Sequence, residues 1–229
     1  PSNPIESTIK FYKCRTKRII SHLKSLFKST KKKKYCQNTI IAWPYNSRND
    51  YINILYGELS SAGIKVVSHK LYLKNLFLPG NLVFHFHWLN AYTNCNLCLS
   101  IIFSAGFLSY LLILKARGVR LVWTVHNIEP YVHHKRNKNI VNLLAKMLLM
   151  LVDKIVVHQQ HVLQKIPKFA INKITYIPHH NYCSLLSDQD PHFSIPSEKY
   201  ILFFGSCSPY KNIEALIRSY IRSLTDKQL

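Results

Sequence analysis

The sequence has little negative charge. Only 10 Asp and Glu residues stand against 31 Lys and Arg residues among 229, which gives a formal net charge of +21. A chain this basic is expected to meet an anionic partner, which can be a membrane surface, a nucleic acid or a phosphorylated substrate. Wholesale disorder is excluded, because 48% of the residues are hydrophobic and can bury a core. The length fits one large domain or two small ones.

Several motifs that carry well-known chemistries are missing. No G-x-S-x-G follows a strand, which excludes a serine hydrolase with a nucleophile elbow. No G-x-G-x-x-G opens the first expected helix, where WPYN (residues 43–46) stands instead, so a dinucleotide-dependent oxidoreductase is not expected. His85 and His87 alternate onto one strand face, but no H-E-x-x-H is present and only Asp50 and Glu129 supply carboxylates nearby. We therefore expect no metal and no other cofactor.

The six cysteines lack the spacing of a disulfide framework, which indicates reduced thiols and a cytoplasmic protein. The C-x-x-C from Cys95 to Cys98 has no second Cys or His pair at zinc-ligand spacing, so helix packing is favoured over a zinc site. No secretory signal peptide is expected, because no apolar h-region and cleavage site follow the basic N-terminal stretch. The chain opens on Pro1 without Met, so we expect either processing or a fragment.

The positive charge gathers at the N-terminus, where residues 1–34 hold 11 Lys and Arg residues against the single acid Glu6. A basic amphipathic helix is expected from Ser7 to Ser29. Such a helix can lie on anionic lipid, which would make the protein peripheral on the inner face of the plasma membrane. The alternative is a solvated arm whose apolar stripe packs on the domain. Nucleic acid is not an expected partner, because the lysine run lacks interleaved stacking aromatics.

From residue 39 onward, short apolar runs alternate with helical segments, which is typical of βαβ units. We therefore predict an α/β fold built on a Rossmann-like parallel sheet. The expected strands are Thr39 to Trp43, Ile64 to Ser68, Leu82 to Phe86, Arg120 to Val125, Lys154 to Val157, Lys173 to Ile177 and Tyr200 to Phe204. The expected helices are Asp50 to Ala62, Asn94 to Ala116, Asn137 to Val152, Gln160 to Ile166 and Lys211 to Leu224.

The run from Leu97 to Leu114 is apolar apart from three serines and one tyrosine. It approaches the length of about 20 residues that a membrane span needs. However, Gly118 and a strand follow within a few residues, as in a crossover connection, and Ser100, Ser104 and Gly106 suit close packing on a sheet. A buried or membrane-touching helix is therefore favoured over a true span.

Histidines stand at the carboxyl ends of four successive expected strands. His87, His126 and His158 each follow a strand directly, and His179 comes two residues after another. In an open parallel sheet, ligands bind in the crevice beyond these ends, where loops converge and helix N-termini present unpaired N–H groups. The rim expected around this cleft consists of His87, Trp88, His126, Asn127, His158 and His179.

A second α/β unit is expected to begin near the C-terminus. An apolar run is followed by Gly205 and then by a helix with Lys211 in its first turn. Glycine lets the backbone approach a ligand closely, and the helix dipole and the lysine favour an anion such as a diphosphate. The expected organisation is a basic arm (1–38), a Rossmann-like N-terminal domain (39–178), a linker rich in Ser, Asp and Pro (179–199) and the start of a second domain (200–229).

In this order, the motifs resemble the N-terminal domain, linker and first βα unit of a GT-B glycosyltransferase of the group 1 type. The resemblance covers about residues 39–224 and is closest to bacterial exopolysaccharide enzymes such as mannosyltransferases that act on lipid-linked saccharides. It rests on WPYNSRN (43–49), LY (55–56), HFHW (85–88), VWTVHN (122–127), VVH (156–158), IPH (177–179), FG (204–205) and PYKN (209–212).

The resemblance implies that a sugar passes from a nucleotide-sugar to a lipid-linked saccharide acceptor held by the N-terminal domain, without an obligatory metal. By position, His126 would contact the donor sugar or the reacting centre and is the implied catalytic residue. The residues implied for donor binding are Gly205, Lys211, His158 and His179. The residues implied for acceptor binding are Tyr45, Asn46, His87, Trp88 and Asn127.

The sequence also departs from the family pattern. Ser206, Cys207 and Ser208 occupy the turn in which the family usually has an Arg, and His180 stands where a Gly is common. The paired-Glu segment that holds ribose and sugar has no counterpart in the sequence, so we expect a truncated or degenerate copy or a fragment. The alternative is a membrane- or polyanion-binding α/β module without catalysis, which the basic arm and the net charge favour.

Overall fold

The structure, a computed structural model, describes residues 21, 37–45, 49–70, 72–88, 96–126, 138–179, 201–203, 205 and 211–225. The chain divides into two units, Pro1–Leu186 and Ser187–Leu229, and each is described by itself. The predicted basic arm lies outside the described residues apart from Ser21, which is helical, and residues 37 and 38. Most of the predicted linker, residues 180–199, also lies outside them.

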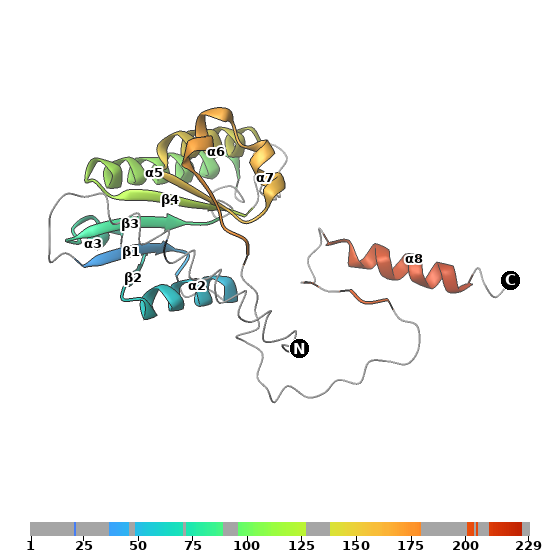
Figure 1. Cartoon of the computed structure of the whole chain (residues 1–229). Coiled ribbons are helices and arrows are strands. Elements are labelled where there is room, and N and C mark those ends of the chain that lie inside the picture. The colour runs from blue at the N-terminus through green and yellow to red at the C-terminus, as the bar shows by residue number, and fades with distance from the viewer. Residues whose placement is uncertain are drawn as a thin grey trace, which may run out of the picture. The chain divides into compact units, whose positions relative to one another are not determined.

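Strands and helices alternate along the first unit (Figure 1). The strands are β1 (Asn38–Trp43), β2 (Lys65–Ser68), β3 (Asn81–Phe86), β4 (Arg120–Val125), β5 (Lys154–Val157) and β6 (Ile174–Tyr176). The helices are α2 (Asp50–Ser61), α3 (Tyr72–Leu76), α5 (Leu97–Ala116), α6 (Lys138–Leu151), α7 (Gln160–Lys165) and the 3-10 helix η2 (Lys168–Lys173). All the strands predicted for this unit are confirmed to within one residue at each end, whereas α3 and η2 were not predicted.

The strands form one six-stranded sheet in the order β2-β1-β3-β4-β5-β6, and every neighbouring pair is parallel. The predicted α/β class with a Rossmann-like parallel sheet is therefore confirmed. The chain passes from β1 to β2 at one edge and then crosses to β3 on the other side of β1, so the strand order reverses between β1 and β3. Trp43 of β1 pairs with Phe86 of β3, and the residues after both strands meet at the edge where such sheets bind ligands.

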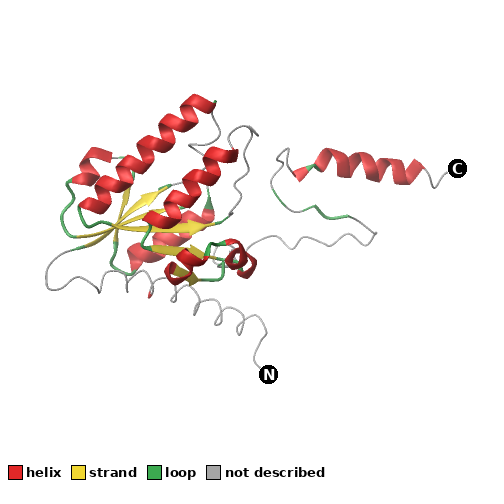
Figure 2. Ribbon diagram, turned by 90° about the horizontal axis from the view of Figure 1, so that it is seen from above, coloured by secondary structure: helices red, strands yellow, loops and turns green. Residues whose placement is uncertain are grey.

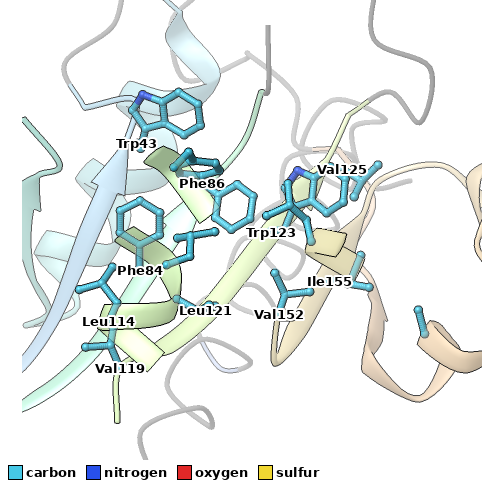
Figure 3. Packing of buried hydrophobic residues seen from close by; sticks show 14 of the residues in the cluster. Trp43, Phe84, Phe86, Leu114, Val119, Leu121, Trp123, Val125, Val152 and Ile155 are labelled. Carbon is cyan, nitrogen blue, oxygen red and sulfur yellow. The ribbon is translucent and has the colours of Figure 1, made fainter. Parts of the chain in front are cut away.

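Helices cover both faces of the sheet (Figures 1 and 2). One face packs against α5 and α6, which contact each other. This layer is apolar: Phe84, Phe86 and Trp123 from the strands meet Phe107 and Leu111 from α5, and Figure 3 shows its aromatic rings close together. The rings of Phe86 and Trp123 are stacked with centroids 5.8 Å apart. Each large apolar side chain buried here contributes about 1.5–3 kcal/mol to folding.

The opposite face packs against α2. Five residues of this helix are buried at spacings of three and four, which is the pattern of one helix face: Tyr51, Ile52, Leu55, Tyr56 and Leu59. The helix begins after Asn49, whose side chain accepts a hydrogen bond from the backbone N–H of Tyr51 over 3.0 Å. Because two of the five buried residues are tyrosines, α2 brings hydroxyl groups beneath the sheet.

Helix α5 is the crossover connection between β3 and β4. It ends at Ala116 and is followed by Gly118, which has a φ of 80°, and the N–H of Val119 bonds to the carbonyl of Leu114 over 3.0 Å. A glycine in this conformation after a helix is a common helix stop. The predicted crossover connection is therefore confirmed, and the chain enters β4 two residues after Gly118.

Among the helices that the structure describes, α5 alone is long and apolar enough to cross a membrane by length and composition. It nevertheless packs on the sheet, because Ser100, Ser104 and Leu111 on one of its sides are buried. The prediction of close packing by the two serines is confirmed, whereas the prediction for Gly106 is wrong, since that residue is exposed. Much of the remaining surface of α5 is apolar and exposed.

In the second unit, the structure describes residues 201–203, 205 and 211–225. The predicted helix forms as α8 (Ile213–Thr225), but the strand predicted from Tyr200 to Phe204 is wrong, since residues 201–203 belong to no strand. A strand is stable only when a neighbour pairs with its backbone N–H and C=O groups. No such neighbour is present among the described residues of this unit, so residues 201–203 form no strand.

Candidate functional site

Four histidines meet beyond the carboxyl ends of β3 to β6. His87, His126 and His158 directly follow β3, β4 and β5, and His179 lies beyond β6. The ring centroids of His87 and His126 are 5.4 Å apart, and those of His126 and His158 are 5.3 Å apart. The rings of His158 and His179 are 5.0 Å apart. The structure thus brings together the four histidines that the sequence placed at strand ends.

Tyr51, in the first turn of α2, packs against all four of these histidines. Its ring centroid lies 5.0 Å from that of His126 and 4.9 Å from that of His179. The centroids of His87 and His158 are 5.6 Å and 5.4 Å away. This tyrosine was not predicted from the sequence. The one signal that could have indicated it is its position in the first turn of the first helix after β1, because that helix begins beside the point where the strand order reverses.

His158 is held in one tautomer. Its Nδ1 lies 2.7 Å from the carbonyl oxygen of Ile177, which can only accept, so Nδ1 carries the hydrogen. The Nε2 atom is then an acceptor, and the hydroxyl of Tyr51 donates to it over 3.0 Å. Since both ring nitrogens are engaged, His158 positions Tyr51 and offers a ligand only the edge or face of its ring.

His126 has one ring nitrogen with which it can contact a ligand. The indole of Trp88 stacks on it, with centroids 4.5 Å apart and an interplanar angle of 14°. Its Nε2 lies 3.1 Å from Nδ1 of His87. Its Nδ1 has no hydrogen-bond partner among the residues that the structure describes. His126 is also partly exposed, whereas His87 is buried.

Beneath this rim lies a second polar level formed by Tyr56, His85 and Thr124, all of them buried. The hydroxyl of Tyr56 lies 3.0 Å from Nε2 of His87 and 3.2 Å from Nδ1 of His85. Nε2 of His85 lies 2.8 Å from the hydroxyl of Thr124. We call the six residues Tyr51, Tyr56, His85, His87, Thr124 and His158 the histidine layer. They lie on the face of the sheet that α2 covers, next to buried apolar residues such as Ile40, Val83 and Val122.

Burial keeps these histidines neutral. It lowers the pKa of His85 to about 3, with a further contribution from His158, and the pKa of His126 to about 3, where His158 and His179 add to the effect. Burial also lowers the pKa of His158 to about 4 and holds the pKa of His87 well below 6.5. At neutral pH each ring therefore carries one donor and one acceptor nitrogen and no charge.

Such a rim suits a neutral ligand that is rich in hydroxyl groups. Neutral imidazole nitrogens can pair with hydroxyls in either direction, and the indole of Trp88 presents an apolar face against which a sugar ring can pack. The described residues of this rim carry no carboxylate, so general acid–base chemistry by an Asp or Glu has no basis among them. The arrangement therefore favours binding and orientation of a polar substrate at His126.

Tyr45, predicted to face an acceptor, lines a cavity of about 250 Å³ beside α2. The other lining residues are Ile52, Asn53, Tyr56, Gly57 and Ser60. Tyr56 belongs both to this lining and to the histidine layer. Two further predicted acceptor contacts, Asn46 and Asn127, lie outside the described residues.

Gly205 and Lys211, the predicted diphosphate contacts, belong to the second unit. Gly205 has a φ of 149°, a conformation that side chains rarely tolerate, and Lys211 lies just before α8. No side chain at position 205 therefore limits access to the backbone.

In the part of the chain that the structure describes, no three His, Cys, Asp or Glu side chains are arranged to hold a metal ion. His85 and His87 do share one strand face, as the sequence indicated, with ring centroids 4.4 Å apart. Their ring nitrogens are engaged with Tyr56, Thr124 and His126. Comparison of the chain with protein-family models, with curated proteins and with solved structures finds no match.

Proposed function

We propose that this protein transfers a sugar from a nucleotide-sugar to a saccharide acceptor, as a GT-B glycosyltransferase of the group 1 type. The observation that carries the proposal is the convergence of four histidines and Tyr51 at the carboxyl edge of a parallel sheet, beside the point where the strand order reverses. The motif series shared with that family adds to it. A lipid-linked saccharide of polysaccharide biosynthesis is the acceptor class that the resemblance favours.

In this proposal, His126 contacts the donor sugar at the reacting centre. Its stacking on Trp88 fixes the ring plane, and its Nδ1, which has no hydrogen-bond partner among the described residues, is left for the substrate, so both features fit that role. Trp88 and Tyr45 then meet the acceptor, Tyr45 from the cavity beside α2. A departing diphosphate gains negative charge as the sugar leaves, so Lys211 and the backbone at Gly205 are the groups proposed to stabilise it.

The test is turnover of nucleotide-sugars by the full chain. UDP-glucose, GDP-mannose and related donors are incubated with a lipid-linked saccharide, and release of the nucleoside diphosphate is measured with and without EDTA. We expect turnover that survives the chelator and falls by about 100-fold in His126→Ala, the loss typical of one group that stabilises the transition state. His161→Ala, an exposed histidine on α7, is the matched control and should retain turnover.

Two outcomes oppose the proposal. Wild-type turnover by His126→Ala would remove this residue from the mechanism. If the wild-type chain neither binds nor turns over any donor in the panel, glycosyl transfer by this chain is rejected. The alternative function, a binding module, is then favoured, and a separate observation supports it.

That observation is the surface of α5 and α6. Seven large apolar residues of α5 and three of α6 are exposed: Leu97, Leu99, Ile101, Ile102, Phe103, Leu112, Ile113, Leu143, Met147 and Met150. Neither helix contains an Asp or Glu; Lys138 and Lys146 supply positive charge, while Lys115 forms an ion pair with Asp153 over 3.0 Å. A surface that is apolar and cationic is complementary to a bilayer with anionic headgroups. We propose that this surface docks on such a bilayer, peripherally and on its cytoplasmic side.

Flotation of the full chain with phosphatidylglycerol-containing vesicles tests this docking. At 0.5 M NaCl the Debye length has fallen to roughly a few ångströms, so the attraction of the basic arm to the vesicle is screened. Binding that persists at this salt concentration is therefore due to the apolar surface. We expect Ile102→Ser with Ile113→Ser to lose this salt-resistant binding. The matched control is Ile217→Ser with Ile221→Ser, two similarly exposed isoleucines of α8.

Salt-resistant binding that is unchanged in the α5 variant, or lost equally in the α8 control, would contradict docking through this surface. Sedimentation velocity without lipid separates the other occupant. A wild-type dimer that the α5 substitutions convert to a monomer would show that a second copy of the chain, and not lipid, covers the surface.

A further inference from the structure

Five side chains are joined end to end by hydrogen bonds beneath His126. They form the imidazole chain Thr124, His85, Tyr56, His87 and His126. The four links measure 2.8, 3.2, 3.0 and 3.1 Å in this order. His85 and His87 each use both ring nitrogens in these links. His126, at the end of the imidazole chain, uses one.

The chemistry of these groups permits only two arrangements of the hydrogens. A neutral imidazole has one N–H and one acceptor nitrogen, so a ring that donates at one link accepts at the other. Tyr56 has a single hydroxyl hydrogen, which can face His85 or His87 but not both. If both rings donated to its oxygen, the buried hydrogen would have no partner among the described residues, which is unfavourable. All links therefore point the same way.

The two arrangements correspond to two tautomers shared by all three rings. When the hydrogens point from His126 towards Thr124, each ring carries its hydrogen on Nε2. When they point from Thr124 towards His126, each ring carries it on Nδ1. Burial lowers the pKa of all three rings, which excludes their charged form at neutral pH. No ring can therefore carry a hydrogen on both nitrogens and donate at both of its links.

We propose that the imidazole chain makes its three histidines adopt one common tautomer and thereby decides whether His126 presents a lone pair or an N–H to its ligand at Nδ1. In the first arrangement, Nδ1 of His126 can accept a hydrogen bond from a substrate hydroxyl. In the second, it donates one to a substrate oxygen. Tyr56, His85, His87 and Thr124 are then positioning residues that act through His126.

The meaning of Nδ1 for a sugar substrate rests on the proposed function, but the common tautomer does not. Long-range proton–nitrogen correlation spectra of the full chain, labelled with ¹⁵N and recorded at pH 7 without donor or acceptor, distinguish Nδ1–H from Nε2–H rings. We expect His85, His87 and His126 to share one tautomer. His158, fixed by the carbonyl of Ile177, should show Nδ1–H and serves as the internal reference.

A mixture of Nδ1–H and Nε2–H among the three rings of the wild-type chain would overturn the proposal. This outcome is independent of turnover. A common tautomer without glycosyl transfer would support this inference and reject only the proposed function. Glycosyl transfer with mixed tautomers would support the proposed function and reject only this inference.

Two single-hydroxyl variants locate the coupling. Tyr56→Phe keeps the ring and removes the central link, so the signals of His85 Nδ1 and His87 Nε2 should move while those of His158 stay in place. Tyr51→Phe is the matched control, because its hydroxyl bonds to His158 outside the imidazole chain, and it should move only the His158 signals. Unchanged His85 and His87 signals in folded Tyr56→Phe, judged from a dispersed amide spectrum, would also overturn the proposal.

Discussion

The two faces of the sheet use the same strands for different purposes. Along β3, Leu82, Phe84 and Phe86 face α5 and α6, while the alternate residues His85 and His87 face α2. One face is a dry apolar layer in which rings such as Phe86 and Trp123 stack. The other face also buries apolar residues such as Val83 and Val122, but beside them it carries the histidine layer, which is joined by hydrogen bonds. Successive side chains of a strand point to opposite faces of the sheet, so neighbouring residues of one strand belong to the apolar layer and to the polar network.

This difference separates two sources of stability. The apolar layer depends on the area removed from water, which does not change with pH. The histidine layer depends on neutral rings whose buried nitrogens find partners, so protonation or the loss of one hydroxyl disturbs it. Measurements that change only one of these two conditions should therefore affect only one of the two layers.

Acidification should produce the largest effect, and it acts on the histidine layer. An unfolded histidine titrates near 6.5, whereas the folded rings do so much lower, so between these values the unfolded chain binds protons that the folded chain excludes. Stability is therefore full above pH 6.5 and falls as the pH drops. His85 alone should cost about 2 kcal/mol between pH 7 and pH 5.

Urea unfolding at a series of pH values measures this loss, to which His87, His126 and His158 add. His85→Gln, which cannot titrate, should make the pH dependence shallower by about one proton. His161→Ala, on the exposed side of α7, should leave it unchanged. A free energy of unfolding that stays constant between pH 7 and pH 5 would show that the histidine layer is not neutral and buried as described.

A cavity in the apolar layer should have the next largest effect. Leu111 is completely buried between α5 and the sheet, and Leu111→Ala should lower the free energy of unfolding by about 3 kcal/mol. Because this substitution neither adds nor removes a titratable group, the loss should be equal at pH 7 and pH 5.5. A loss that grows on acidification would mean that the two layers are coupled through the sheet, which would break the comparison.

Removing one hydroxyl from the histidine layer should have a smaller effect. Tyr56→Phe leaves His85 and His87 each with a buried nitrogen that has lost its partner, so we expect a loss of about 2 kcal/mol. Tyr51→Phe deprives only His158 and should cost less. Equal stabilities of the wild type and Tyr56→Phe in urea unfolding at pH 7 would indicate that water replaces the missing hydroxyl.

The sequence predicted the strands of the first unit well, because each is a short apolar run with turn residues on both sides. It also predicted the meeting of His87, His126, His158 and His179, since parallel strands bring their carboxyl ends to one edge. Neither inference required knowledge of which side chains touch.

The parts that could not be predicted depend on tertiary contact. Tyr51 and Tyr56 occupy ordinary apolar positions of an amphipathic helix, and only the packing of α2 on the sheet gives their hydroxyls a role. The strand expected at residues 200–204 was wrong because strand formation also depends on tertiary contact. Its apolar composition is suitable, but a strand forms only with a neighbour to pair with.

The smallest expected effect is a gain that acts on neither layer. Gly57 lies inside α2 on its exposed side, and an added Cβ would meet nothing within 4 Å. Glycine costs a helix interior about 1 kcal/mol relative to alanine, so Gly57→Ala should raise the free energy of unfolding by up to that amount. The gain should be the same at pH 7 and pH 5.5, because the histidine layer lies on the other side of the helix. Since Gly57 also lines the cavity with Tyr45, a folded, more stable Gly57→Ala that turns over donor less efficiently would show that glycine is needed there for room and not for the fold.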